Sequence, residues 1–274
     1  MLHFAVAGAP LSTPKPGGTV EGIRRAHALG ITAMELEWVQ NVPKNPERMA
    51  EIRSTAEELN MVLTVHAPYF VNLNAKEKEK LEASKRRVLD AMEMGQLAGA
   101  RSVCVHPAFY LGGDPEEVYE HVRAATGDIL SRAGKKRLTL NLAFETMGKG
   151  TQFGTLEEVL RLSKEFGIYP CIDSAHMHAR TNGAWNSAKE WNALLDLYQK
   201  SLGKRALKRM HMHYSGIEYT QKGERKHLPL KESDAKWKDF LKVLKARGVE
   251  GVIVCESPAM EKDTVLMQKA FDRM

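Results

Sequence analysis

Short apolar runs alternate with helix-length segments along the whole sequence. The runs are four to six residues long and rich in β-branched side chains, as in VLTVH and GVIVCE, which predicts buried strands. Strands separated by helix-length segments are typical of parallel βα units. Eight such units in 274 residues leave about 34 residues each, which suits a closed barrel. We therefore predict the α/β class, as one (β/α)8 TIM barrel domain over residues 1–274.

The elements can be placed from periodicity and capping residues. Strands are expected at 3–7, 32–36, 61–66, 101–106, 138–145, 168–173, 207–212 and 251–256. Helices are expected at 19–29, 46–60, 76–98, 115–132, 155–166, 187–201, 234–247 and 262–273. Three of the connections that follow strands are long, at 67–75, 174–186 and 212–233, and loops of this kind carry specificity.

Six of the predicted strands end on a residue that can bind a metal. In a closed parallel barrel the carboxyl ends of all strands open on one face, so these side chains should converge there. A set of imidazoles and carboxylates suits zinc, manganese or iron. Any one of them alone is better explained as a helix cap or a rim residue, and the metal hypothesis depends on the whole set. The six residues are His66, His106, Glu145, Asp173, His211 and Glu256.

Composition narrows the class of protein. The net charge of +6 and the pI of about 9.1 suit a polyanionic partner, and the basic run 222–227 lies in a long loop on the predicted metal face. No apolar run reaches 18 residues, so no transmembrane segment is expected. The N-terminus is too short and uncharged for a signal peptide. Cys104, Cys171 and Cys255 lie inside strand runs without CxxC spacing, which favours reduced thiols and a cytoplasmic protein.

Two adjacent aromatic residues, Tyr69 and Phe70, follow the strand that ends at His66. They could pack over their own loop, or they could serve as a wedge or stacking platform for nucleic acid bases.

Several segments resemble the endonuclease IV family of metal-dependent apurinic/apyrimidinic endonucleases. The segment FETMGKGTQFG at 144–154 resembles its glutamate signature, and CIDSAH at 171–176 resembles its second signature. RMHMH at 209–213 is similar to the third signature, although Met212-His213-Tyr214 departs from the usual Leu-Asn-Asp. HAPYF at 66–70 and VHP at 105–107 also fit, so the resemblance covers nearly the whole chain.

The resemblance implies two or three metal ions, usually Zn²⁺, with Mn²⁺ or Fe²⁺ as alternatives. One ion would be held by His66 and His106, and a second by Asp173, His211 and Glu256. Glu145 would bridge the two ions and is the expected catalytic residue, while His176 and His227 would hold a third ion. Whether His213 replaces or assists His211 stays open. Arg225 stands where the family has an aspartate, so either Glu224 supplies that ligand or the third site is weak or empty.

The implied activity is hydrolysis of the phosphodiester 5′ to an abasic site, leaving a 3′-hydroxyl. The implied partner is double-stranded DNA containing abasic sites, bound by a monomer with the abasic nucleotide flipped out. One alternative is a single-metal sugar isomerase or epimerase, for which Glu145, Asp173, His211 and Glu256 would suffice. Another is a non-catalytic damage-binding protein. The expected DNA contacts are Tyr69, Phe70, Asn72, Arg225 and Lys226.

Overall fold

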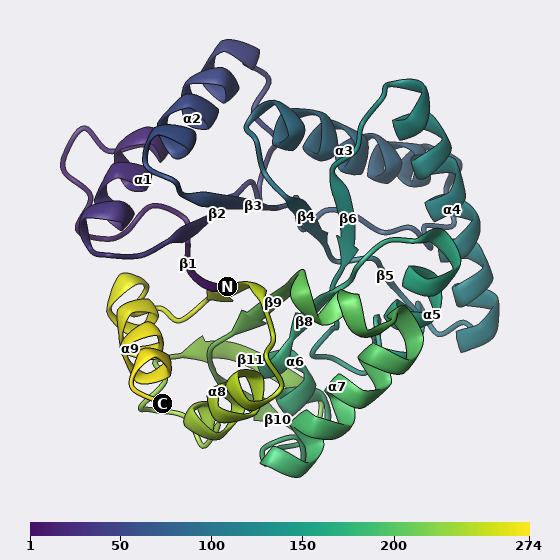
Figure 1. The fold of residues 1–274 in the computed structure, drawn as a ribbon. Helices are drawn as coiled ribbons and strands as arrows, with labels where there is room; N and C mark the ends of the chain where they lie inside the picture. Colours follow the sequence, from purple (N-terminus) through teal and green to yellow (C-terminus); the bar gives the residue numbers. More distant parts are fainter.

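Eight parallel strands form a nearly closed barrel in the computed structural model, which describes residues 1–274 (Figure 1). Their order around the barrel is β6-β4-β3-β2-β1-β12-β9-β8, and the isolated bridge between Glu145 and Cys171 joins its two ends. The predicted (β/α)8 TIM barrel is therefore confirmed. The strands are β1 (Leu2–Ala7), β2 (Ala33–Glu37), β3 (Val62–His66), β4 (Ser102–Val105), β6 (Asn141–Phe144), β8 (Cys171–Asp173), β9 (Met210–Tyr214) and β12 (Gly251–Cys255).

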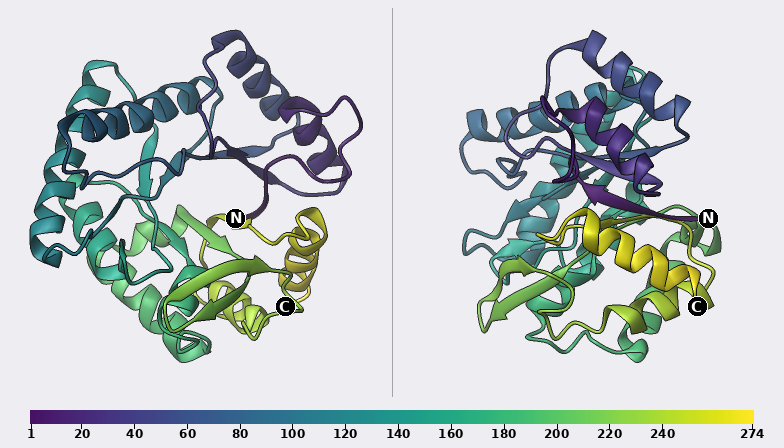
Figure 2. Two further views of the ribbon diagram at one scale, coloured as in Figure 1. Left: turned by 180° about the vertical axis from the view of Figure 1, so that it is seen from behind. Right: turned by 90° about the vertical axis from the view of Figure 1, so that its left-hand side faces the viewer.

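Helices surround the barrel, as both views of Figure 2 show. Local signals fix several of their starts. The Asp114 carboxylate accepts hydrogen bonds from the backbone N–H groups of Glu116 and Glu117, and Thr155 with Glu158 forms a capping box. The outer helices are α1 (Thr19–Ala28), α2 (Pro46–Glu58), α3 (Lys78–Leu97), α4 (Pro115–Lys135), α5 (Leu156–Phe166), α7 (Ala188–Leu202), α8 (Trp237–Ala246) and α9 (Glu261–Asp272). No helix combines the length and the apolar character needed to cross a membrane.

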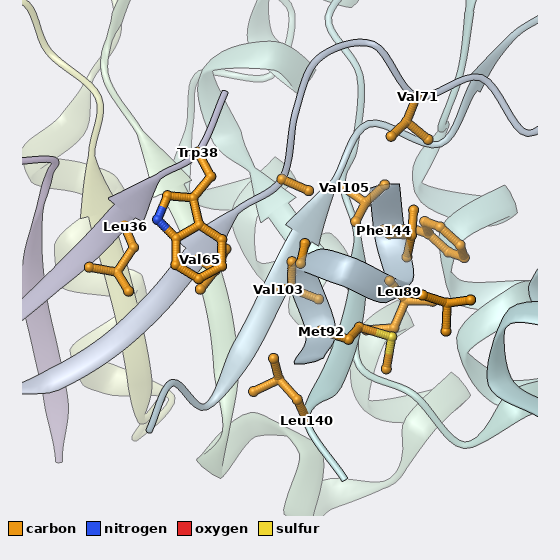
Figure 3. Close-up of a cluster of buried hydrophobic side chains, with 14 of the residues drawn as sticks. Leu36, Trp38, Val65, Val71, Leu89, Met92, Val103, Val105, Leu140 and Phe144 are labelled. Carbon is orange, nitrogen blue, oxygen red and sulfur yellow. The ribbon is translucent and has the colours of Figure 1, made fainter. Parts of the chain in front are cut away.

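The main core lies between the strands and the helices. Alternate strand residues such as Val65, Val103 and Phe144 point outward and pack with Leu89 and Met92 of α3 (Figure 3). The opposite side chains fill the barrel interior. Ala5, Ala33, Val62, Val252 and Val254 form one small apolar cluster there, and buried polar groups occupy much of the remaining interior.

Two of the expected long loops contain regular structure. Helix α6 (Ser174–Arg180) occupies the loop predicted at 174–186, and the hairpin of β10 (Gly216–Thr220) and β11 (Gly223–Leu228) occupies the loop predicted at 212–233. Neither has a clear apolar periodicity in the sequence, because α6 is short and buried on most sides and β11 is largely polar. In the right-hand view of Figure 2 the hairpin lies at the end of the barrel opposite the two termini. A second small ribbon pairs β5 (Ala108–Phe109) with β7 (Gln152–Phe153).

Strand β9 begins three residues later than predicted. The segment before it, Lys204–Lys208, is a 3-10 helix (η1), so the strand covers Met210–Tyr214 rather than 207–212. This shift carries His213, and not His211, to the carboxyl end of the strand.

Candidate metal centre

Glu145 lies at the centre of the carboxyl-terminal mouth of the barrel, directly after β6, and is fully buried. Its Oε2 atom lies 2.9 Å from His106 Nε2 and 3.5 Å from His66 Nε2. Its Oε1 atom lies 3.1 Å from His213 Nδ1 and 3.3 Å from His176 Nδ1. Four imidazoles from four different segments therefore surround a single carboxylate.

A second group of possible ligands shares the other side of Glu145. One ligand atom from each of Glu145, Asp173, His213 and Glu256 lies within 4.8 Å of the others. Asp173 Oδ1 accepts a hydrogen bond of 2.7 Å from the His176 backbone N–H and so caps α6, but Asp173 Oδ2 and Glu256 Oε2 are buried without a hydrogen-bond partner. Unpartnered buried carboxylate oxygens are costly, and a cation in this group would satisfy them.

Three of the histidines are oriented as metal ligands usually are. Each has its Nδ1 atom at hydrogen-bond distance from a backbone carbonyl, which assigns the proton to Nδ1 and leaves Nε2 free to bind a cation. His66 pairs with the carbonyl of Ala67 at 2.8 Å, His176 with that of Thr146 at 3.0 Å, and His227 with that of Glu256 at 3.1 Å. The donor set thus fits divalent cations such as zinc.

The placement of His211 differs from the expectation. His211 lies one layer deeper in the barrel, where its Nε2 contacts Glu35 Oε2 at 2.9 Å and its Nδ1 contacts Ser102 Oγ at 3.0 Å. Residues two apart on a strand point to the same side but at different heights, so the shifted register of β9 places His213 at the level of Asp173. The structure therefore places His213, rather than His211, beside Glu145 and Asp173.

A β-bulge brings Glu224 into the third group of possible ligands. In the hairpin, Glu218 pairs with Lys226 and Tyr219 pairs with Glu224, so Arg225 is an extra residue without a partner on β10. The bulge turns Glu224 and His227 to the same side, where they group with His176 within 4.8 Å. Glu224 Oε2 lies 3.4 Å from His176 Nε2. Glu224, and not Arg225, thus lies with His176 and His227.

The hairpin reaches this position because two glycines allow a close backbone approach. A Cβ atom on Gly148 would lie 2.8 Å from Glu224 Cβ, and one on Gly223 would lie 2.3 Å from the Gly148 carbonyl oxygen. Gly223 also has a φ of 92°, which other residues rarely adopt. Gly148, in the loop after Glu145, therefore lets Glu224 come close enough to His176 and His227 to form the third group.

The carboxylates of the mouth have unequal proton affinities. Burial favours the neutral form of Glu145, but His106 and His213 outweigh this effect and hold its pKa well below the usual range. Burial raises the pKa of Glu256 well above its usual range, against the opposing charge of His213, and the charges of Asp173 and Glu145 add to this rise. For Glu37, burial raises the pKa to about 7. A divalent cation would relieve the repulsion among these carboxylates.

Three residues of the site were not identified from the sequence. Glu37 ends β2 at the mouth, Glu35 lies below it, and Lys149 lines the cavity from the loop after β6. The alternation of two glutamates in the strand AMELE was the available signal for the first two, because acidic side chains facing a barrel interior need partners. Lys149 had no comparable signal.

The predicted DNA contacts fall into three classes. Tyr69 and Phe70 are 46% and 59% exposed, and the Tyr69 ring lies 5.2 Å from both the His66 and the His106 rings. The Asn72 side chain instead holds the loop, because its Oδ1 accepts from the backbone N–H groups of Asn74 and Phe109. Arg225 and Lys226 both pair with Glu218 and point away from the ligand groups.

The three ligand groups open into one cavity of about 580 Å³. Tyr69 and Phe109 form part of its rim, and Lys149 adds a cation. The site residues that line it are Glu37, His66, His106, His176, Glu224, His227 and Glu256.

Comparisons with known proteins identify the family of the chain. Residues 23–274 match the model of the xylose isomerase-like TIM barrel family. An uncharacterized protein of Methanocaldococcus jannaschii is 38% identical over 274 residues, covering 100% of this chain and 98% of its own. A probable endonuclease 4 of Shouchella clausii is 24% identical over 200 residues, covering 66% of each chain.

Solved structures show the same fold. Endonuclease IV from Thermus thermophilus has a TM-score of 0.72 and 22% identity, covering 98% of both chains. A D-tagatose 3-epimerase-like protein has a TM-score of 0.74 and 17% identity, covering 99% of this chain and 96% of its own. The resemblance to endonuclease IV is thus confirmed within a wider group that includes epimerases, and the chain belongs to the xylose isomerase-like TIM barrel family.

Proposed function

We propose that this protein is a metal-dependent phosphodiesterase that cleaves DNA 5′ to abasic sites and leaves a 3′-hydroxyl. The observation that carries the proposal is the number of possible ligands around one mouth: His66 and His106 lie beside Glu145, Asp173, His213 and Glu256 group with the same Glu145, and His176, Glu224 and His227 form a further group. A sugar isomerase needs only one of these groups. The number of buried imidazoles and carboxylates is explained best by two or three cations, with Zn²⁺ proposed as the ion.

The ligands would be divided among these ions in a definite way. His66 and His106 would hold one ion with Glu145, and Asp173, His213 and Glu256 would hold a second, also with Glu145. The remaining group of His176, Glu224 and His227 would hold a third. Divalent cations bound there would neutralise charge on a phosphodiester and lower the pKa of a water molecule.

The protein's own residues would supply positioning. Lys149 faces the cavity as a cation for a phosphate oxygen, and Glu145 stays ionised because adjacent histidines lower its pKa. The exposed Tyr69 and Phe70 would fill the space that a flipped abasic nucleotide leaves in the duplex.

Exposed apolar side chains at the mouth support a macromolecular substrate. Phe109 and Leu111 follow β4 and are 37% and 50% exposed, near the loop of Tyr69 and Phe70. Asn74 of that loop donates to the Phe109 carbonyl at 2.9 Å, so the two loops are joined. Large exposed apolar side chains gathered at one site favour a partner that covers them, which a small sugar would not do.

The direct test uses an oligonucleotide duplex with one abasic site. The purified protein should nick the damaged strand 5′ to that site, should leave a matched intact duplex uncut, and should lose activity with a chelator. Asp173→Asn should behave like the chelated protein. Tight binding of the damaged duplex without any nicking, with metal supplied, would support a non-catalytic damage-binding protein instead.

A second candidate is a single-metal sugar epimerase. Glu145, Asp173, His213 and Glu256 alone form a complete four-ligand set for one cation, and this observation favours it. Metal stoichiometry separates the candidates, since the phosphodiesterase hypothesis requires at least two ions per chain. One ion per chain at saturation, measured by elemental analysis, would favour the epimerase.

We also propose that the protein acts as a cytoplasmic monomer. The three free, buried cysteines motivate the cytoplasmic location. Light scattering with abasic and intact duplexes would test the monomeric state.

A further inference from the structure

A second cavity, of about 480 Å³, opens at the opposite mouth of the barrel. It forms where β6 and β8 separate, because their only backbone pairing is the bridge between Glu145 and Cys171 near the metal centre. Farther down, the Asn141 side chain spans the gap, donating to the Tyr169 carbonyl at 2.9 Å and accepting from the Tyr169 N–H at 2.9 Å. The cavity thus lies between the amino-terminal ends of the strands.

Two arginines of this cavity have no carboxylate partner. Arg101 directly precedes β4 and Arg209 directly precedes β9, so the strand order places both at this mouth. Neither side chain makes an ion pair, whereas Lys208 pairs with Glu250 at 2.9 Å and donates to the Gly248 carbonyl at 2.8 Å. No aspartate or glutamate lines the cavity, so its positive charge is not compensated.

The cavity wall is polar and ordered. Ser102 and His211, both buried, contact each other at 3.0 Å where they line the cavity. The Arg209 guanidinium carbon lies 5.0 Å from the centre of the Tyr169 ring, and this cation–π contact holds the guanidinium group at the cavity. The electrostatic effect extends to His3, whose pKa is lowered by burial and by the positive charges of Arg101 and the N-terminus.

We propose that this cavity is a binding site for a small phosphate-bearing anion. Guanidinium groups bind phosphate oxygens in pairs, and two uncompensated ones at a concave surface form a pocket for a group with two or more negative charges. A DNA duplex is too wide to enter a recess of this volume, so a small molecule fits better than nucleic acid. The site is separate from the metal centre, because His211 and Glu35 lie between them.

The test uses metal-free protein, sodium pyrophosphate as the probe, and isothermal titration calorimetry at constant ionic strength in chloride. The wild type should show saturable binding of one pyrophosphate per chain at this site. The double variant Arg101→Gln/Arg209→Gln should bind pyrophosphate at least tenfold more weakly. Arg86→Gln, which removes an exposed and unpaired arginine of α3, is the matched control and should leave it unchanged. Asp173→Asn should also leave it unchanged, which excludes binding at the metal centre.

Unfolding temperatures without anion should be similar in the double variant and the wild type, because both arginines are exposed and neither makes an ion pair, and Arg209 loses only an exposed contact with the Tyr169 ring. Pyrophosphate affinity that is equal in the double variant and the wild type would overturn the proposal. So would a double variant that binds pyrophosphate normally but loses affinity for intact duplex DNA, because the arginines would then contact a nucleic acid backbone.

Discussion

His213 Nδ1 lies 3.1 Å from Glu145 Oε1, while its neighbour two residues earlier on β9, His211, is directed to Glu35 and Ser102. One strand thus contributes a histidine to the mouth of the barrel and another to the layer beneath it. The two imidazoles have similar burial, so only their contacts distinguish their roles.

Replacing each histidine separately should give different losses. His213→Ala should remove a metal ligand, lowering both the metal content and the nicking rate. His211→Ala should retain metal, because His211 contacts Glu35 and Ser102 rather than Glu145. It should lower the free energy of unfolding by about 1–3 kcal/mol, since the buried Glu35 Oε2 atom keeps only its hydrogen bond from Thr64. Elemental analysis and urea unfolding of both variants would show this difference. Equal metal loss in the two variants would contradict it.

Glu145→Gln should lower nicking by at least about a thousandfold, which corresponds to roughly 4 kcal/mol of barrier. The amide keeps the shape of the side chain but removes the charge that two ligand groups share. Glu157→Gln, on the exposed face of α5, is the control and should leave the rate unchanged. Near-normal single-turnover nicking by Glu145→Gln would reject the bridging role.

Glu224→Ala should lose one metal ion per chain and most activity, because Glu224 is the only carboxylate in the group with His176 and His227. Arg225→Ala is the adjacent control. It should keep the metal, since Arg225 points away and pairs with Glu218. Elemental analysis of both variants measures the effect, and an unchanged metal count in Glu224→Ala would show that the third group does not hold an ion.

Tyr69→Ala combined with Phe70→Ala should reduce the preference for abasic over intact duplex. Wedging or stacking contacts contribute about 1–3 kcal/mol each, and both side chains are exposed at the mouth. Metal content should not change. Competition binding with the two duplexes gives the preference directly. Equal weakening for both duplexes would indicate general binding without recognition of the damage.

The metal-free protein should lose stability at alkaline pH. Burial lowers the pKa of His66, but the hydrogen bond to Glu145 and the charges of Glu37, Glu145 and Glu35 together outweigh burial and raise that pKa to about 10. A raised histidine pKa gives stability that is complete below the unfolded value of 6.5 and lost as pH rises through about 10. Melting temperatures should therefore fall from about pH 7 to about pH 10, and fall less in Glu145→Gln. A parallel fall in both proteins would contradict the pairing.

Much of this protein follows from the sequence alone. Alternating apolar runs and helix-length segments predict the barrel, because burial on both faces of a parallel strand requires continuous apolar residues. Ligand-type residues at strand ends place His66, His106, Glu145 and Asp173 at one mouth, since all parallel strands end on the same face. These signals can be read from neighbouring residues alone, because strand length and helix capping depend on local sequence.

The tertiary structure decided what depended on register. The sequence RMHMH offers two histidines on the same side of one strand, and only the pairing of β9 with β8 and β12 determines which one reaches the mouth. In the same way, only the bulge at Arg225 turns Glu224 toward His176. The cavity at Arg101 and Arg209 depends on the gap between β6 and β8. A shift of one residue reverses the direction of every side chain on a strand, and such shifts are fixed by contacts between segments far apart in sequence.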